Sequence, residues 1–193
     1  MQLQSLSAAS DSGLLHWQNR RSAATIALTL LLMLCAGSAP AAELSAVTAA
    51  APPDLRLQDL SGQTRSLDEF TDKVVLVTFW ASWCRPCIEE MPGIKRLAAA
   101  MADQPFTVVG VNVGEGERRV QAAAGRLRIE FPVLLDKDST AFKDWGADVL
   151  PTAYVLDRSG RIRYIARGPM EWDRVDIVET LKQLAAEQRP GLE

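Results

Sequence analysis

Hydrophobic and polar residues follow one another along this chain with two periodicities, that of a buried strand and that of an amphipathic helix. Two continuous apolar runs, residues 74–80 and 106–113, predict strands that are covered on both faces. A shorter apolar segment at 133–136 predicts a third strand. Two further apolar segments, 152–156 and 162–166, flank a polar, glycine-containing turn and predict a hairpin.

Helices are predicted where hydrophobic residues recur every three or four positions. This spacing occurs at residues 87–101, 117–129 and 171–187, and a shorter helix is expected at 138–145. A small hairpin at 55–67 precedes the first long strand. Strands therefore alternate with helices, which predicts an α/β domain with one mixed sheet and helices on both of its faces.

The N-terminal 41 residues have a different pattern. Arg20 and Arg21 precede an uncharged segment whose most apolar part, residues 23–36, has the length of a signal-peptide core. Small residues around Pro40 offer a cleavage site. We expect residues 1–41 to be a signal peptide or, alternatively, an uncleaved membrane anchor, because the uncharged stretch is nearly long enough to span a bilayer when tilted.

The segments that follow complete the predicted domain organisation. Cys35, at the end of the apolar run, permits a lipidated N-terminus. However, Leu34 before it is bulky, whereas sequences that resemble lipoprotein signals have Gly, Ala or Ser at this position. Residues 42–53 are Ala-rich, end in two prolines and lack periodicity, which predicts a flexible tether. The domain is expected to span 54–189. In each interpretation it is exported, which predicts a periplasmic location, either free after cleavage or anchored at the inner membrane.

Charge and histidine content exclude several function classes. Removal of residues 1–41 leaves 19 basic and 23 acidic residues, from 21 and 24 in the full chain, and this balance does not suggest a nucleic-acid surface. The same cut removes Cys35 and the only histidine, His16. Hydrolases with a Ser-His-Asp or Cys-His pair need an imidazole base, and most zinc or copper sites need histidine or more than two thiolates. We therefore expect no metal and no cofactor.

The two remaining cysteines, Cys84 and Cys87, are separated by two residues and follow the first long strand. A disulfide between them closes too short a loop to constrain the unfolded chain much. Trp83 and Pro86 beside them suit an exposed, reactive turn. The pair therefore predicts a redox-active dithiol rather than a structural disulfide.

The predicted helix distinguishes the two thiols. A thiol attacks as its thiolate, and the N-terminus of a helix lowers the pKa of a thiol. Cys84, where the helix begins, is thus expected to be the nucleophile, and Cys87, one turn along, to resolve the mixed disulfide. Arg85 between them adds positive charge near the thiolate, or else is a solvated surface cation whose charge is screened.

Three motifs together resemble the thioredoxin-like family, in particular its exported TlpA/ResA branch. They are the run TFWASWCRPCIEEMP around the cysteines, the run VNVGE at residues 111–115, and Leu150-Pro151-Thr152 ahead of a strand. The resemblance covers about residues 53–184. It implies a thioredoxin fold, a mixed central sheet flanked by helices, with an N-terminal hairpin and an extra helix and strand at 117–136.

The resemblance also implies how a substrate is held. Pro151 would be a cis-proline facing the disulfide, and Leu150 would present its backbone to a substrate chain that pairs with it as an added strand. The alternative is an ordinary trans proline at the start of a strand. The expected substrate-binding residues are Trp83, Arg85, Pro86, Leu150, Pro151 and Thr152.

Proton transfer is expected to differ from that of thioredoxin, which has a buried Asp where this chain has Thr78. Glu90, three residues after Cys87, matches the acidic residue that the ResA branch places near its cysteines. Burial would raise the pKa of its carboxyl group and allow proton exchange with Cys87. The alternative is that Glu90 is a surface residue of the helix.

These features predict a protein thiol-disulfide oxidoreductase that acts as a reductant and that a membrane thiol donor keeps in the dithiol form. By family analogy, its substrates would be oxidised cysteine pairs in other exported proteins, for cytochrome c maturation or respiratory metal-site assembly. Two alternatives are a thiol peroxidase of the peroxiredoxin type, with Cys84 as the oxidised thiol, and a copper carrier, although carriers on this fold add a histidine ligand.

Overall fold

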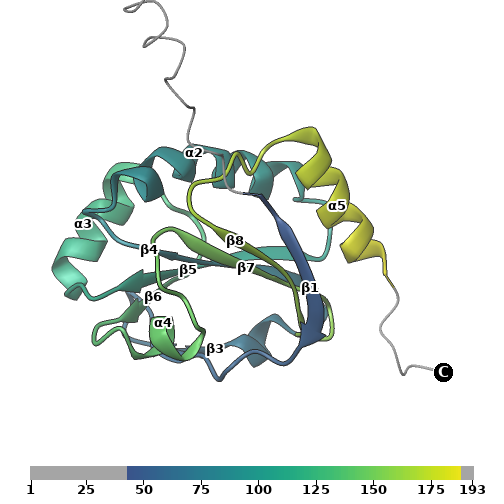
Figure 1. Ribbon diagram of the computed structural model, residues 1–193. Coiled ribbons are helices and arrows are strands. Elements are labelled where there is room, and N and C mark those ends of the chain that lie inside the picture. The colour runs from purple at the N-terminus through teal and green to yellow at the C-terminus, as the bar shows by residue number, and fades with distance from the viewer. Residues whose placement is uncertain (1–42, 188–193) are drawn as a thin grey trace, which may run out of the picture. The chain divides into compact units, whose positions relative to one another are not determined.

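The computed structural model of the 193-residue chain describes residues 43–187. These residues form a six-stranded mixed sheet in the order β1-β8-β7-β4-β5-β6 and a two-stranded sheet of β2 and β3 (Figure 1). The strands are β1 (Ser45–Ala50), β2 (Arg56–Gln58), β3 (Thr64–Ser66), β4 (Val74–Trp80), β5 (Phe106–Val113), β6 (Val133–Asp136), β7 (Thr152–Leu156) and β8 (Ile162–Arg167). The helices are η1 (Leu67–Phe70), α2 (Arg85–Ala100), α3 (Glu117–Leu127), α4 (Thr140–Asp144) and α5 (Val175–Ala186). This architecture confirms the predicted α/β thioredoxin-like fold.

β4 is a central strand of the large sheet and leads directly to the cysteine motif. All of its residues are buried. β5 pairs with it in parallel on one side and β7 in antiparallel on the other. Phe79 near its end lies opposite Thr152, the first residue of β7. The sheet register therefore brings Pro151, which precedes β7, next to the end of β4.

Two layers cover the two faces of this sheet (Figure 1). Leu76 and Trp80 of β4 belong to a core with apolar residues of α2, α3 and α5. Val77 and Phe79 belong to a second core, formed with the β2–β3 hairpin, η1 and α4. Successive residues of a strand point to opposite faces, so a strand covered on both faces is apolar at nearly every position, here all but Thr78.

The segment predicted to be a flexible tether, residues 42–53, contains strand β1. Ser45 pairs with Ile165 of β8, and Ala50 pairs with Ile162, in antiparallel register. The prediction was wrong for β1 because the small residues of this segment carry no apolar periodicity. Its order comes from backbone pairing along the edge of β8, which local sequence does not reveal.

Strands β4 to β7 have the predicted bounds, whereas α2, α4 and α5 begin elsewhere. α4 begins at Thr140 rather than at residue 138. α2 begins at Arg85, ahead of the predicted residue 87, because Cys84 is its N-cap and Pro86 lies in its first turn, a position that suits proline. α5 begins at Val175 rather than at residue 171. The residues before Val175 form a loop that contacts α2.

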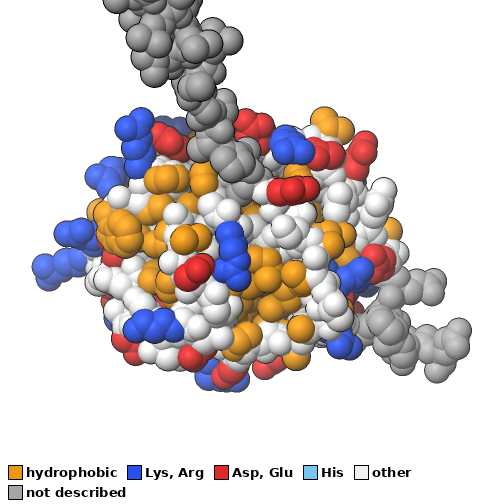
Figure 2. Space-filling model, in the orientation of Figure 1, with side chains coloured by type: hydrophobic (Ala, Val, Ile, Leu, Met, Phe, Trp, Pro, Cys, Tyr) orange, Lys and Arg blue, Asp and Glu red, His pale blue; other side chains and the backbone are white. Residues whose placement is uncertain are grey.

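The surface combines charges of both signs. On the face drawn in Figure 2, Lys and Arg side chains are interspersed with Asp and Glu side chains, and hydrophobic side chains lie between them. Within residues 43–187, no helix is long and apolar enough to cross a membrane. The predicted signal peptide or anchor at 1–41, which includes Cys35, lies outside the described residues.

Candidate functional site

A disulfide between Cys84 and Cys87 lies at the N-terminus of α2. Cys84 is the N-cap, and its Sγ accepts a hydrogen bond from the backbone N–H of Cys87 at 3.3 Å. Cys84 is 5% exposed, whereas Cys87 is fully buried. The backbone N–H groups and the positive end of the helix dipole favour a negative charge on a sulfur at this position. The outer sulfur is therefore both the more accessible one and the one better placed to be a thiolate.

The two residues that flank Cys84 point towards solvent. Trp83 is 65% exposed, which is unusual for a large hydrophobic side chain. The Arg85 side chain is 88% exposed, and its Nε donates to Oε1 of Glu89 at 2.7 Å. The charge of Arg85 is thus partly neutralised by Glu89 and screened by water, which limits its effect on Cys84.

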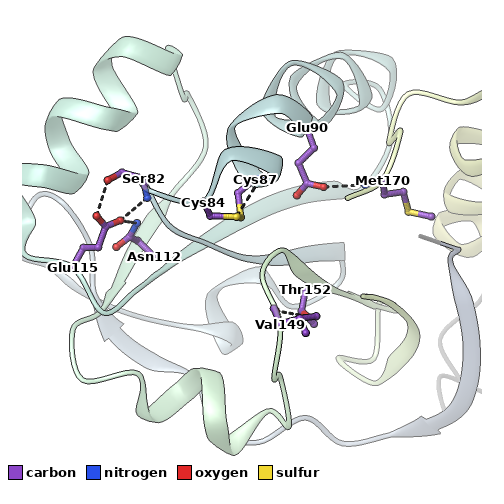
Figure 3. The surroundings of a disulfide bond; sticks show 9 residues. All are labelled: Ser82, Cys84, Cys87, Glu90, Asn112, Glu115, Val149, Thr152 and Met170. Carbon is purple, nitrogen blue, oxygen red and sulfur yellow. Dashed lines mark hydrogen bonds between the residues drawn. A yellow bond between two sulfur atoms is a disulfide. The ribbon is translucent and has the colours of Figure 1, made fainter. Parts of the chain in front are cut away.

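The segment before β7 lies beside this turn. The Leu150–Pro151 peptide bond is cis, as the family resemblance implies. Thr152 Oγ1 donates to the carbonyl of Val149 at 2.8 Å (Figure 3). The carbonyl of Pro151 accepts from the N–H of Gly168, also at 2.8 Å. These hydrogen bonds hold the segment in place at the edge of the site.

A groove of about 630 Å³ runs between the cysteine turn and the segment before β7. It includes Cys84 in its lining. Its apolar lining residues are Trp83, Pro86, Val113, Phe142, Val149 and Leu150, and its charged ones are Arg85, Lys143 and Asp148. The groove thus brings together four of the predicted substrate-binding residues, whereas Pro151 and Thr152, which begins β7, are not part of its lining. Such a lining suits an apolar side chain next to the reactive sulfur.

Glu90 points from α2 towards Met170 in the loop after β8 (Figure 3). Its side chain is buried, which excludes the surface alternative. Its Oε2 accepts from the N–H of Met170 at 3.2 Å, and its Oε1 has no hydrogen-bond partner. Burial raises the pKa of Glu90 to about 8, although the Met170 N–H and the Trp172 side chain oppose this shift. Near neutral pH the carboxyl group is therefore largely protonated.

A second buried carboxylate, Glu115, lies on the other side of the disulfide (Figure 3). It accepts hydrogen bonds from the N–H and the hydroxyl of Ser82, both at 2.6 Å, and from Nδ2 of Asn112 at 2.9 Å. Burial acts to raise the pKa of Glu115, but these hydrogen bonds outweigh it and hold the pKa below its usual value. The carboxylate thus fixes the turn two residues before Cys84.

The sequence-based site did not include Ser82, Asn112 or Glu115. Residues 111–115 entered it only as a family motif without a role. Their position was a usable signal, because the carboxyl ends of neighbouring parallel strands meet at one edge of a sheet. Asn112 and Glu115 come at the end of β5, which is parallel to β4.

Thr78 is fully buried within β4, and its hydroxyl has no hydrogen-bond partner. This chain thus has a neutral side chain at the position where thioredoxin has a buried Asp. The buried acid near the cysteines on α2 is Glu90 instead. Among the described residues, no three His, Cys, Asp or Glu side chains are grouped so as to hold a metal ion.

Comparisons with known proteins agree with this site. The family model described as Redoxin matches residues 46–184. The thiol-disulfide oxidoreductase ResA of Geobacillus thermodenitrificans is 33% identical over 132 residues, which cover 68% of this chain and 75% of that protein. The thioredoxin-like protein YneN of Bacillus subtilis is 40% identical over 121 residues, 61% of this chain and 70% of that protein.

Solved structures give the same result. The crystal structure of a thiol:disulfide interchange protein of the thioredoxin family from Chlorobium tepidum superimposes with a TM-score of 0.60 at 26% identity and covers 71% of this chain and 99% of that one. The Redoxin model matches most of the described residues, the sequence is similar to ResA, and the cysteine pair lies at the start of α2. This chain therefore belongs to the redoxin family of thioredoxin-like proteins and is a thiol-disulfide oxidoreductase.

Proposed function

We propose that the protein is an exported reductant of disulfide bonds in other exported proteins, acting through Cys84 and Cys87. The observation that carries this proposal is the asymmetry of the pair. Cys84 lines the apolar groove, whereas Cys87 is fully buried behind it. A substrate chain in the groove therefore reaches Cys84 first.

The proposed reaction consists of two thiol exchanges. In the reduced protein the Cys84 thiolate attacks one sulfur of a substrate disulfide, a mixed disulfide forms, and the other substrate sulfur leaves as a thiolate. The Cys87 thiolate then attacks the Cys84 sulfur and releases the second substrate thiolate. The substrate gains two electrons, and this protein ends as the Cys84–Cys87 disulfide. A thiol donor in the membrane restores the dithiol by the same exchange in reverse.

Glu90 is proposed to exchange a proton with Cys87 during this cycle. The two residues are three positions apart on α2 and share a face of the helix. Glu90, with a pKa of about 8, is largely protonated near neutral pH and so has a proton to give to the Cys87 thiolate. Thr78 has no acidic group with which to do this.

The groove suggests the form of the substrate. Its apolar lining favours an extended chain with a hydrophobic side chain next to the cysteine that is attacked. Leu150, ahead of β7, is proposed to pair with that chain as with an added strand. Trp83, exposed at the rim, would be covered by the bound chain.

Location and pathway belong to the proposal as well. Export to the periplasm rests on the signal-like pattern of residues 1–41. A role in cytochrome c maturation or in the assembly of respiratory metal sites rests on similarity to the ResA group. The substrate would be an apoprotein whose cysteines have been oxidised after export.

The test is to trap the substrate in the exporting cell. Cys87→Ser removes the resolving thiol, so mixed disulfides at Cys84 should accumulate and mass spectrometry should identify an exported partner. Cys84→Ser is the matched control and should trap nothing. Absence of mixed disulfides with Cys87→Ser would overturn the proposed substrate class.

Two measurements separate the proposal from its alternatives. A reductant should have a potential at or below about −200 mV, whereas a value near about −120 mV is that of a strong oxidant and would contradict the proposal. Rapid turnover of the reduced protein with hydrogen peroxide at Cys84 would favour a peroxidase instead.

A further inference from the structure

The loop between β8 and α5, residues 168–174, closes over Glu90. The N–H of Gly168 donates to the carbonyl of Pro151 at 2.8 Å, and the N–H of Met170 donates to Glu90 Oε2 at 3.2 Å. Met170 and Trp172 are 5% and 1% exposed. One loop thus contacts both the segment before β7 and the buried carboxyl group.

An ion pair and a glycine hold this loop against α2. Arg96 Nε donates to Asp173 Oδ2 at 2.6 Å. A Cβ on Gly93 would lie 3.0 Å from Asp173 Oδ1 and 3.6 Å from the backbone N of Trp172. Glu90, Gly93 and Arg96 are spaced three residues apart, so they lie along one side of α2. The glycine therefore permits the close approach that the ion pair maintains.

The surroundings of Glu90 make it sensitive to where this loop lies. Glu90 Oε1 and the indole N–H of Trp172 are both buried, and neither makes a hydrogen bond of good geometry, although Trp172 lies close enough to lower the pKa of Glu90. Burial is the main influence on the carboxyl group, opposed by the Met170 N–H and Trp172. Among the described residues, no charged side chain of α2 or of the loop is a cause of the shift in the Glu90 pKa. These charged residues are Arg85, Glu89, Lys95 and Arg96 on α2, and Glu171, Asp173 and Arg174 in the loop.

We propose that the Arg96–Asp173 ion pair is a positioning device for Glu90, holding the β8–α5 loop on α2 so that water is kept from the carboxyl group. Both side chains are partly exposed, and such pairs contribute little to global stability. The effect is local, because a loop can open without unfolding the domain. Its consequence for catalysis rests on the function proposed above, whereas its effect on Glu90 does not.

The first test measures the titration of Glu90 through the ¹³C chemical shift of its carboxyl group. It compares the disulfide forms of the wild type, Asp173→Asn and Glu187→Gln. In Asp173→Asn the titration midpoint should fall by about one pH unit or more, since desolvation is what raises it. Glu187→Gln removes a similar exposed ion pair, with Arg163 at 2.7 Å, and should leave the midpoint unchanged. An unchanged midpoint in Asp173→Asn overturns the proposal.

Gly93→Ala tests whether loop position, rather than charge, is responsible. The added methyl group crowds Asp173 and Trp172 without changing any charge, so the Glu90 midpoint should again fall. Gly125→Ala in α3, where nothing lies within 4 Å of the new Cβ, is the control. A shift in Asp173→Asn without one in Gly93→Ala would show a charge effect and overturn the positioning role.

The pH profile of the redox potential distinguishes this proposal from the function it serves. If Glu90 exchanges a proton with Cys87, the pH at which the Cys84–Cys87 potential changes slope should move with the Glu90 midpoint in Asp173→Asn. A shifted midpoint with an unaltered potential profile would leave the positioning role standing and contradict the proton exchange.

Discussion

Two buried carboxyl groups, Glu90 and Glu115, lie on either side of the disulfide (Figure 3). Glu90 accepts one hydrogen bond, from Met170, and burial raises its pKa to about 8. Glu115 accepts three from Ser82 and Asn112, which keep its pKa below the usual value despite burial. Near neutral pH the Glu90 carboxyl group is largely protonated, whereas Glu115 is a carboxylate whose hydrogen bonds anchor the cysteine turn.

The raised pKa of Glu90 predicts that stability falls as pH rises. Below its ordinary pKa of 4.5 the carboxyl group is protonated in both the folded and the unfolded state; between 4.5 and about 8 only the unfolded state ionises. In that window the free energy of unfolding should decrease by up to about 1.4 kcal/mol per pH unit. Above about pH 8 the carboxyl group is ionised in both states, so the stability that its protonation provides is gone and the slope ends. Urea unfolding of the disulfide form across this range measures the slope.

Glu90→Gln should abolish that slope, since it removes the titrating group and keeps an acceptor for the Met170 N–H. Glu89→Gln changes an exposed neighbour and should behave as the wild type does. The same pH dependence in Glu90→Gln and wild type would show that the carboxyl group does not titrate in this way.

Glu115 is predicted to stabilise the turn before the cysteines. Glu115→Ala leaves the N–H and hydroxyl of Ser82 and the amide of Asn112 without their acceptor, which should cost about 1–3 kcal/mol in the free energy of unfolding. Urea denaturation measures this loss. Glu179→Ala on the outer side of α5 should change stability much less, and an equal effect of the two substitutions would contradict the anchoring role.

At the scale of elements, the site is built where strands end. β4 leads to the cysteine turn, β5 leads to Glu115, and β7 begins directly after Pro151. The bounds of these strands were predictable because strands buried on both faces are continuous apolar runs. The start of α5 was not, because Trp172 fits a helical pattern but is buried in the loop that closes over Glu90.

Gly110 of β5, which lies opposite Thr78 of β4, has little room for a side chain. A Cβ on Gly110 would lie 3.0 Å from the Phe131 ring and 3.3 Å from Trp80 Nε1. Gly110→Ala should therefore destabilise the fold by about 1–3 kcal/mol through overpacking. Gly125→Ala, in an open helical position, should instead be neutral or stabilise by about 0.5–1 kcal/mol. Thermal unfolding of both variants tests this opposite sign.

At the scale of the whole molecule, the large sheet begins with a strand from the segment that links the domain to residues 1–41. β1 occupies one edge of the sheet beside β8, and β6 occupies the other. Leu44 and Val47 pack against the two cores from this segment. The folded part of the chain therefore begins no later than Ser45, ahead of the residue 54 that the sequence predicts.

A chain that begins at residue 54 should be less stable than one that begins at residue 43. Removing β1 leaves the edge of β8 unpaired and uncovers apolar side chains that it protects. If the pairing contributes about 2 kcal/mol, Tm should fall by roughly 4 °C or more. Equal Tm values for the two chains would mean that residues 43–53 behave as the tether that the sequence predicted.

The cysteine pair and its place at the start of a helix, the central strands and the family motifs could be predicted from the sequence, because each consists of residues that are adjacent in the chain. The raised pKa of Glu90, the anchoring by Glu115 and the pairing of β1 follow only from the folded structure. Each of these depends on a partner remote in sequence: Met170, Ser82 and Ile165 respectively. Burial and hydrogen bonding to such partners set the charge of a carboxyl group, and local sequence carries no record of either.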